Sequence, residues 1–158
     1  MRVGIGYDIH RFEDSRRLVL GGVEFPGETG LAGHSDADVL VHAVIDALLG
    51  AAALGDIGSH FPPDHTAYEG ADSIDLLRNT GKLLADNGFA VESVDSTVIA
   101  ETPRLAPHIA QMRKRLANAL AIDGGRVNVK ATTNEGLGPI GRGEGIAAMA
   151  VTLIVPAE

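Results

Sequence analysis

The chain has 158 residues and 45% hydrophobic content, which predicts one globular domain, residues 1–158, with a sizeable core. Its 13 Lys and Arg against 21 Asp and Glu give a net charge of −8 without a basic cluster, so we expect no nucleic-acid partner. Cysteine is absent, which excludes thiolate sites and leaves histidine and carboxylates as ligands for any transition metal.

The first predicted strand begins at Val3 and ends with the segment Tyr7-Asp8-Ile9-His10. Apolar residues alternate with glycines along it, which is typical of a strand that another backbone approaches closely. Because residues two apart point to the same side of a strand, Asp8 and His10 project together. They would form half of a metal site.

A tight hairpin is predicted next, because Leu18–Leu20 and Val23–Phe25 flank the pair Gly21-Gly22. The proline and glycines between 26 and 33 then predict an irregular loop. The first helix is expected to begin near Asp36, with Ser35 as its N-cap.

One face of this helix is polar. Asp38, His42 and Asp46 follow one another at four-residue steps and therefore share a side, while the neighbouring residues are mostly apolar. A polar stripe on an otherwise apolar helix indicates that these side chains have a specific role.

The rest of the chain predicts alternating helices and strands, typical of a mixed-sheet α/β domain. No apolar run approaches the roughly 20 residues of a membrane span, so we expect a cytoplasmic protein with no membrane partner. The predicted elements are a loop over 50–64, a helix over Ser73–Asn87, a strand over Phe89–Ala100, a helix that starts around Pro107 and is ended by Asp123-Gly124-Gly125, a strand over 127–132 and an apolar strand, covered on both faces, over Ile146–Val155.

Asp8, His10 and His42 together satisfy the ligand count of a catalytic zinc site, which commonly takes three nitrogen and oxygen donors. Asp46, one turn beyond His42, would then orient its imidazole. The alternative is that Asp8 and His10 are turn residues and His42 is a solvated helix histidine. Spacing alone leaves both interpretations open.

A phosphate site is predicted at the start of the first helix. His34 and Ser35 precede the helix, where free backbone N–H groups and the helix dipole favour an anion. The alternative makes Ser35 only an N-cap and His34 only a loop residue.

A second phosphate-binding segment follows the strand that ends at Thr132. The hydroxyls of Thr132 and Thr133 suit phosphate oxygens, and the carboxylate of Glu135 suits Mg²⁺ or Mn²⁺ bridging a diphosphate. Arg142 would clamp a phosphate or remain a solvated charge, and an ordinary surface loop is the alternative for the whole segment. The remaining histidines, which have no informative partner spacing, are interpreted as surface or structural residues: His60, His65 and His108.

Six motifs in order along nearly the whole chain resemble the 2-C-methyl-D-erythritol 2,4-cyclodiphosphate synthase family. They are Tyr-Asp-x-His at 7–10, Gly-His-Ser-Asp-x-Asp at 33–38, His42, Asp-Ile-Gly at 56–58, Phe-Pro at 61–62 and Lys-Ala-Thr-Thr-Asn-Glu at 130–135. The resemblance implies a single α/β domain with a mixed sheet of four to five strands, covered by helices on one face. It also implies a homotrimer with sheets facing its interior and active sites between subunits.

The implied reaction belongs to non-mevalonate isoprenoid biosynthesis. The 2-phosphate of 4-diphosphocytidyl-2-C-methyl-D-erythritol 2-phosphate attacks the β-phosphate, and CMP leaves. Such an enzyme is a phosphorus–oxygen lyase that acts by positioning and charge neutralisation. Two alternatives remain open: a zinc-dependent phosphohydrolase, and a non-catalytic trimer that binds nucleotides or isoprenoid phosphates.

The resemblance also implies residue roles. Asp8, His10 and His42 would hold Zn²⁺, and Glu135 would hold Mg²⁺ or Mn²⁺ with the substrate diphosphate. His34 and Thr133 would be the catalytic residues that stabilise the transition state. The other implied substrate contacts are Ser35 and Thr132 near the phosphates; Asp56, Ile57 and Gly58 near the sugar or erythritol hydroxyls; Ala100, Pro103, Arg104, Leu105, Ala106 and Ala131 around the cytosine; and Arg142.

Overall fold

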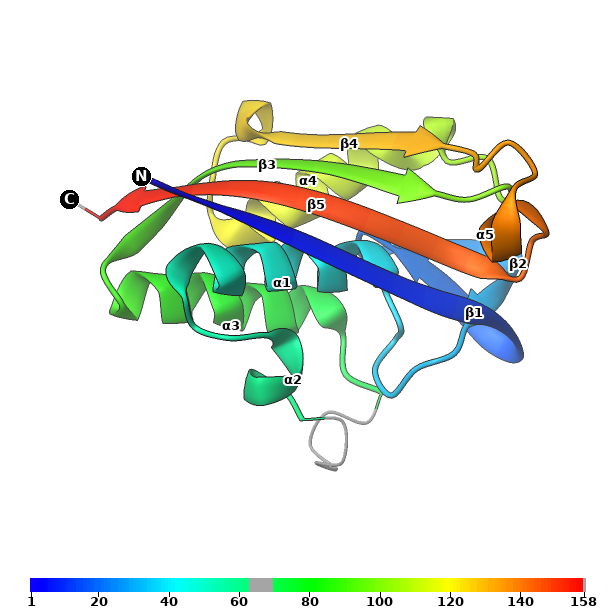
Figure 1. Cartoon of the computed structure of the whole chain (residues 1–158), viewed down its shortest axis with the longest axis horizontal. Coiled ribbons are helices and arrows are strands. Elements are labelled where there is room, and N and C mark those ends of the chain that lie inside the picture. Colours follow the sequence, from blue (N-terminus) through cyan, green and yellow to red (C-terminus); the bar gives the residue numbers. More distant parts are fainter. Residues whose placement is uncertain (63–69, 158) are drawn as a thin grey trace.

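The computed structural model describes residues 1–62 and 70–157 and contains a five-stranded mixed sheet (Figure 1). The strand order is β2-β1-β5-β3-β4; β3 and β4 are parallel and the other neighbours are antiparallel. The predicted mixed-sheet α/β fold is therefore confirmed. The strands are β1 (Arg2–Leu20), β2 (Val23–Leu31), β3 (Phe89–Ile99), β4 (Val127–Thr132) and β5 (Gly145–Pro156).

Three helices pack on one face of the sheet: α1 (Val39–Ala52), α3 (Ser73–Asp86) and α4 (Ile109–Leu120) (Figure 1). Their apolar sides and the facing sides of the strands form the core. Shorter turns connect the elements: α2 (Ile57–His60), η2 (Ala106–His108), η3 (Gly124–Arg126) and α5 (Gly138–Gly141). Among the described residues, the structure has no helix whose length and apolar character would let it cross a membrane.

Helix α1 lies unusually close to β1, and two glycines permit it. A Cβ atom placed on Gly4 would lie 1.9 Å from the carbonyl oxygen of Ala47, and one on Gly6 would lie 2.0 Å from that of Ala43. Only glycine allows this approach, which confirms the interpretation of the glycines in the first strand. The close packing brings His42, next to Ala43, over the end of the Tyr7-Asp8-Ile9-His10 segment.

The N-terminus of α1 is anchored by a buried carboxylate. Asp38 accepts hydrogen bonds from the N–H of Val41 at 3.1 Å and from the N–H groups of Gly21 and Gly22 at 2.9 and 2.7 Å. Asp38 therefore joins the hairpin turn to the helix. Burial and the nearby charge of Asp36 raise its pKa to about 6, against the opposing effect of the three N–H donors.

Two predictions about this region are wrong. The helix begins at Val39 with Asp38 as its N-cap, and Ser35 caps nothing there. The hydroxyl of Ser35 instead accepts from the N–H of Ala37, which closes a separate turn before the helix. Residues 26–31 belong to β2, because this strand lies at the sheet edge, where proline and an irregular register are tolerated.

The predicted loop over 50–64 is also partly helical. Helix α1 continues to Ala52, and Asp56 caps the short helix α2 by accepting from the N–H of Ser59. The loop prediction for residues 63 and 64 lies outside the described residues. The hairpin, the helices beginning at Ser73 and in the segment after Pro107, and the last three strands are confirmed.

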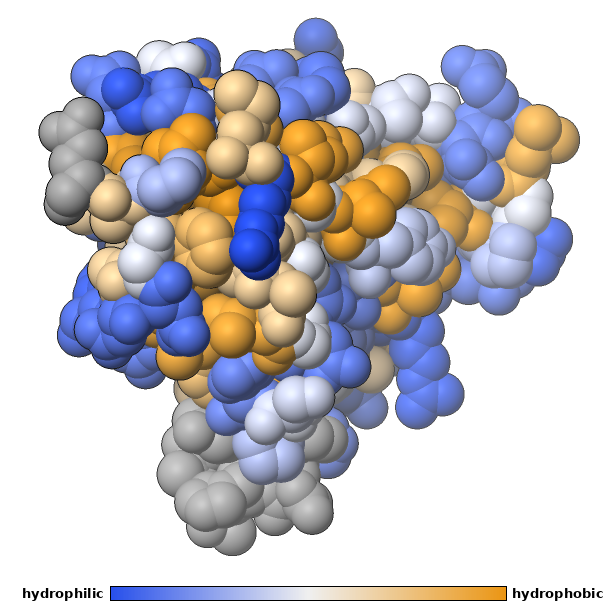
Figure 2. Space-filling view, turned by 60° about the vertical axis from the view of Figure 1, so that its left-hand side comes forward, coloured by the Kyte–Doolittle hydropathy of each residue, from blue (hydrophilic) through white to orange (hydrophobic). Residues whose placement is uncertain are grey.

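The face of the sheet opposite the helices carries exposed apolar side chains. In the single chain β5 is therefore covered on one face, and not on both as predicted. Hydrophobic residues accordingly reach the surface between polar ones (Figure 2). The residues of this apolar face are 42–66% exposed, and they are Val3, Ile5, Tyr7 and Ile9 of β1 with Met149 and Val151 of β5.

Candidate metal centre and substrate pocket

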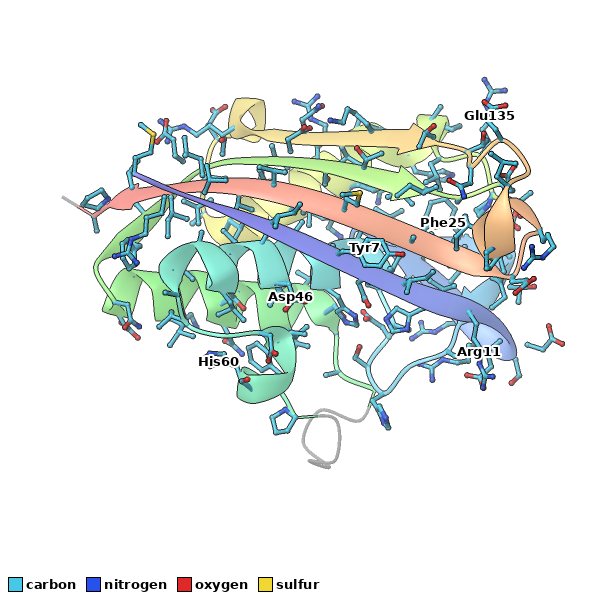
Figure 3. All side chains as sticks on the ribbon, viewed as in Figure 1. Tyr7, Arg11, Phe25, Asp46, His60 and Glu135 are labelled. Atoms are coloured by element: carbon cyan, nitrogen blue, oxygen red, sulfur yellow. The ribbon has the colours of Figure 1, made fainter. Side chains whose placement is uncertain are left out.

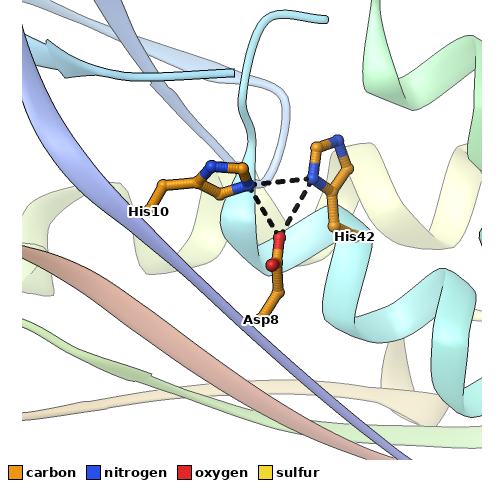
Figure 4. Close-up of side chains that lie close together, drawn as sticks. All are labelled: Asp8, His10 and His42. Atoms are coloured by element: carbon orange, nitrogen blue, oxygen red, sulfur yellow. Dashed lines mark hydrogen bonds and ion pairs between the residues drawn. The ribbon is translucent and has the colours of Figure 1, made fainter. Parts of the chain in front are cut away.

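Asp8, His10 and His42 point toward one another at the junction of β1 and α1 (Figure 4). The Oδ2 atom of Asp8 lies 2.9 Å from His10 Nε2 and 3.0 Å from His42 Nδ1, and the two nitrogens are 3.3 Å apart. Strand alternation places Asp8 and His10 on one side, and the close packing of α1 supplies the third donor. Two imidazole nitrogens and one carboxylate oxygen match the donor set of a catalytic zinc site, so the triad could hold a metal ion.

The charges in this triad favour an ionised carboxylate. Burial alone would raise the pKa of Asp8, but hydrogen bonds and charge interactions with His10 and His42 hold this pKa well below its usual range. Burial lowers the pKa of His10, whereas the Asp8 carboxylate raises it, and the net effect is upward from 6.5. A metal cation held between the three donors would likewise favour the ionised carboxylate.

The second nitrogen of His42 faces hydroxyl groups. Its Nε2 lies 3.0 Å from Ser73 Oγ and 3.1 Å from Ser35 Oγ. The prediction that Asp46 orients His42 is wrong, because the Asp46 carboxylate accepts from the N–H of Ile57 at 2.8 Å and so holds the start of α2. A one-turn spacing places Asp46 beside His42, but the ring points toward α3 instead.

A cavity of about 250 Å³ opens next to the triad. It brings together several residues that the sequence assigned to substrate, namely Asp8, His10, His34, Ser35 and the pair Ile57-Gly58, with His42. Its remaining wall contains Gly33, Asp46, Phe61 and Leu76. Asp56 lies just before this wall, and its carboxylate accepts from the N–H and hydroxyl of Ser59.

The segment after β4, which the sequence predicts to bind phosphate, does not line this cavity. Glu135 lies past the end of β4, at the upper right of Figure 3, well away from Asp46 on α1. Thr132, Thr133 and Glu135 are exposed, and Glu135 has a left-handed backbone with a φ of 52°. Within one chain the two halves of the predicted site are therefore separate.

The predicted cytosine segment adjoins the segment after β4. The N–H of Ala100 donates to the carbonyl of Thr132, and the Glu101 carboxylate accepts from the N–H of Asn134. Pro103 lines a second cavity of about 330 Å³. The other residues assigned to this half are placed as follows: Arg104 and Ala106 are exposed, Leu105 is buried, Ala131 is exposed on β4, and Arg142 pairs with Glu144 at 2.7 Å.

The remaining histidines have structural contacts where they are described. A ring nitrogen of His60 lies 2.7 Å from the carbonyl oxygen of Leu54, and the ring of His108 packs against Phe25 at 4.5 Å between centroids. His65 lies outside the described residues.

Four side chains near the two halves of the site were missed from the sequence. Arg16 donates to the carbonyl oxygens of Gly33 and Ser35 and so holds the loop that carries His34. Asp36 and Ser73 stand behind His42, and Glu101 holds the backbone beside Glu135. Their separation along the chain has no characteristic spacing, so no sequence signal could have paired them.

Comparison with known proteins then assigns the family. The model of the YgbB family matches residues 1–155, nearly the whole chain. The chain belongs to the YgbB family. Curated relatives named 2-C-methyl-D-erythritol 2,4-cyclodiphosphate synthase include one from Syntrophomonas wolfei, 60% identical, covering 98% of both chains, and one from Clostridium perfringens, 56% identical, covering 98% of this chain and 99% of the relative.

Solved structures share the fold of this YgbB-family chain. The bifunctional IspDF from Campylobacter jejuni superposes with a TM-score of 0.95 at 39% identity; the match covers 99% of this chain and 42% of that longer one. A CDP complex of IspF from Plasmodium falciparum superposes with a TM-score of 0.86 at 32% identity, covering 99% of this chain and 97% of the other. The predicted family is thus confirmed, and its fold is shared along the chain.

Proposed function

We propose that this YgbB-family chain converts 4-diphosphocytidyl-2-C-methyl-D-erythritol 2-phosphate to 2-C-methyl-D-erythritol 2,4-cyclodiphosphate with release of CMP. The observation that carries the proposal is the Asp8-His10-His42 triad, whose donors converge beside a cavity that also contains His34 and Gly58. Relatives that cover nearly the whole chain at 54–60% identity bear the name of this synthase. The reaction would belong to non-mevalonate isoprenoid biosynthesis.

The chemistry needs no external nucleophile. An oxygen of the 2-phosphate attacks the β-phosphorus, the bond between this phosphorus and the bridging oxygen breaks, and CMP leaves with that oxygen. Zn²⁺ held by Asp8, His10 and His42 would supply Lewis-acid neutralisation of phosphate charge. His34, exposed at the cavity wall, would donate a hydrogen bond to a phosphate oxygen, and Gly58 with Ile57 would contact the erythritol part.

The second half of the site would come from the segments after β3 and β4. Glu135 would hold Mg²⁺ or Mn²⁺ with the substrate diphosphate, while Thr133 and Thr132 would orient phosphate oxygens. The backbone of residues 100–106, together with Ala131, would surround the cytosine, and Arg142 would contact phosphate after leaving Glu144. The relative solved as a CDP complex supports a cytidine diphosphate ligand.

A homotrimer would complete this arrangement. The two halves of the site are separate within one chain, so a neighbouring chain would have to supply the cytosine and second-cation half. The apolar face formed by residues such as Ile5, Tyr7 and Val151 is exposed, which supports burial of the sheet in the trimer interior.

The test is a purified-protein assay with Zn²⁺ and Mg²⁺ and the authentic substrate. The expected result is CMP release with the cyclic diphosphate as the phosphorus-containing product, observed by ³¹P NMR. His42→Ala should lose bound zinc and this activity together. In water labelled with ¹⁸O, the product should contain no label from solvent.

Each alternative function gives a different result in the same assay. Label in the product would identify a phosphohydrolase that uses water as its nucleophile. Binding of CDP without turnover at any metal concentration would identify a non-catalytic binding protein. Glu135→Gln should chiefly weaken the dependence on Mg²⁺ or Mn²⁺, and an unchanged metal titration would remove Glu135 from that role.

A further inference from the structure

The imidazole of His42 has two nitrogens in different surroundings. Nδ1 faces the triad, 3.0 Å from the carboxylate of Asp8. Nε2 faces away from it, 3.0 Å from the Ser73 hydroxyl and 3.1 Å from the Ser35 hydroxyl. The ring is therefore held between its candidate metal position and two hydroxyls, one from the loop before α1 and one from α3.

The direction of the hydrogen bond at Ser73 follows from its other partner. The Ser73 hydroxyl donates to Oδ1 of Asp36, and the Ser73 N–H donates to Oδ2 of the same carboxylate at 3.0 Å. A hydroxyl whose proton is committed to a carboxylate has only lone pairs left for a third group. It can accept a hydrogen bond from His42 Nε2 but cannot donate one to it. The Ser35 hydroxyl lies 3.5 Å from the Ser73 oxygen, so its own proton has Ser73 Oγ as an acceptor.

The anchoring groups are rigid. Ser73 is fully buried at the first position of α3, and its backbone N–H is one of the free donors of that helix end. Asp36 is tied to the same place, because its own N–H donates to the carbonyl of Ala71 at 3.1 Å. An acceptor fixed in this way constrains both the position and the rotation of the His42 ring.

We propose that Ser73, anchored by Asp36, is a positioning residue that holds a proton on Nε2 of His42 and directs the lone pair of Nδ1 toward Asp8 and His10. The carboxylate, the hydroxyl and the imidazole form a chain from Asp36 to the metal position. Outer partners of this kind orient a ligand histidine and increase its basicity. The inference rests on the metal site of the proposed function and assigns that site a support from α3.

The test compares two variants that each remove a buried hydroxyl from α3. Ser73→Ala removes the acceptor behind His42. Thr80→Val is the matched control, because the Thr80 hydroxyl is equally buried but donates to the carbonyl of Leu76, away from the site. Zinc affinity is measured by competition with a chelating indicator, and thermal unfolding with chelator present reports folding.

Zinc binding of Ser73→Ala should weaken by about 10- to 100-fold, the usual effect of losing such a partner. Thr80→Val should bind zinc as the wild type does, even where its thermal stability falls. In zinc-loaded protein labelled with ¹⁵N-histidine, the Nε2 proton of His42 should give a protected signal that Ser73→Ala loses. If Ser73→Ala does not fold, Asp36→Asn provides the test, because it removes one of the two oxygens that anchor Ser73.

The outcomes separate the two proposals. A wild-type protein that binds no zinc would refute the proposed metal site and with it the proposed function. Stoichiometric zinc in the wild type, with equal affinity in Ser73→Ala and an unchanged Nε2 proton signal, would refute the positioning role alone.

Discussion

Gly6→Ala should destabilise the protein and disturb the metal triad at the same time. The added Cβ would lie 2.0 Å from the carbonyl oxygen of Ala43, and that distance must increase to about 3.4 Å, the short limit of ordinary contact. The opposing atoms belong to the backbone of α1 and cannot rotate away. The helix must therefore move off β1, and His42, the residue before Ala43, must move with it.

The magnitude follows from this displacement. Overpacking a core typically costs 1–3 kcal/mol, and a clash with backbone belongs at the upper end, so we expect a loss of about 3 kcal/mol in the free energy of unfolding. Metal–ligand distances tolerate only about 0.2 Å, so a shift of His42 away from Asp8 should weaken zinc binding by at least about tenfold. Urea unfolding with chelator present measures the first effect, and competition titration measures the second.

Gly50→Ala is the matched control. Gly50 lies in the same helix and is exposed, and a Cβ added there would meet no atom within 4 Å. This variant should become more stable by up to about 1 kcal/mol, because alanine is the better helix former, with unchanged zinc affinity. The reasoning fails if Gly6→Ala unfolds at the wild-type urea concentration and binds zinc as tightly as the wild type.

Three further predictions concern the groups around the site. Zinc affinity should rise with pH through the raised pKa of His10, because the cation competes with the proton for the imidazole. In the metal-free protein the Asp8–His10 pair should stabilise the fold most between pH 3.8 and 6.5. Below this range the lowered pKa of Asp8 makes the contribution of the carboxylate disappear, and above it the raised pKa of His10 makes the contribution of the imidazole disappear. Zinc titrations at several pH values test the first statement, and unfolding curves across pH, with Asp8→Asn for comparison, test the second. A flat profile in either measurement would contradict the corresponding statement. Asp38→Asn should lower the free energy of unfolding, measured in urea, by about 2 kcal/mol, because the new NH₂ group would face N–H donors whose hydrogen bonds the carboxylate now accepts. Asp123→Asn, at an exposed cap, should change this free energy little. Arg16→Lys should lower turnover while zinc stays bound, because one ammonium cannot reproduce both hydrogen bonds to the loop that carries His34; equal turnover would show that Arg16 does not position this loop.

Local patterns predicted most of the elements. The pair Gly21-Gly22 between two apolar runs located the hairpin, and the apolar periodicity after Ser73 located α3. The predictions failed where a neighbour in space changed the outcome. Proline has no N–H to donate, so it interrupts a strand only where a neighbouring strand requires that donor. Pro26 is tolerated because β2 lies at the edge of the sheet.

At the start of α1, too, a neighbour in space decided what the local sequence could not. Ser35 and Asp38 are both good N-caps by residue type, so the sequence alone does not choose between them. The folded chain chooses Asp38, because the N–H groups of Gly21 and Gly22 also need an acceptor there. Asp46 was assigned to His42 from helical spacing, yet spacing along a helix does not determine which way a ring turns.

By itself the sequence determined that Asp8 and His10 share one side of a strand, because side chains alternate along any extended chain. It also supplied His42 as a third donor and the motifs that resemble the family. Only the tertiary structure decided that His42 meets Asp8, since that contact depends on two glycines that let α1 approach β1. It likewise decided that Ser73, 31 residues beyond His42, supports the ring, because contacts between distant segments arise from packing and have no period in the sequence.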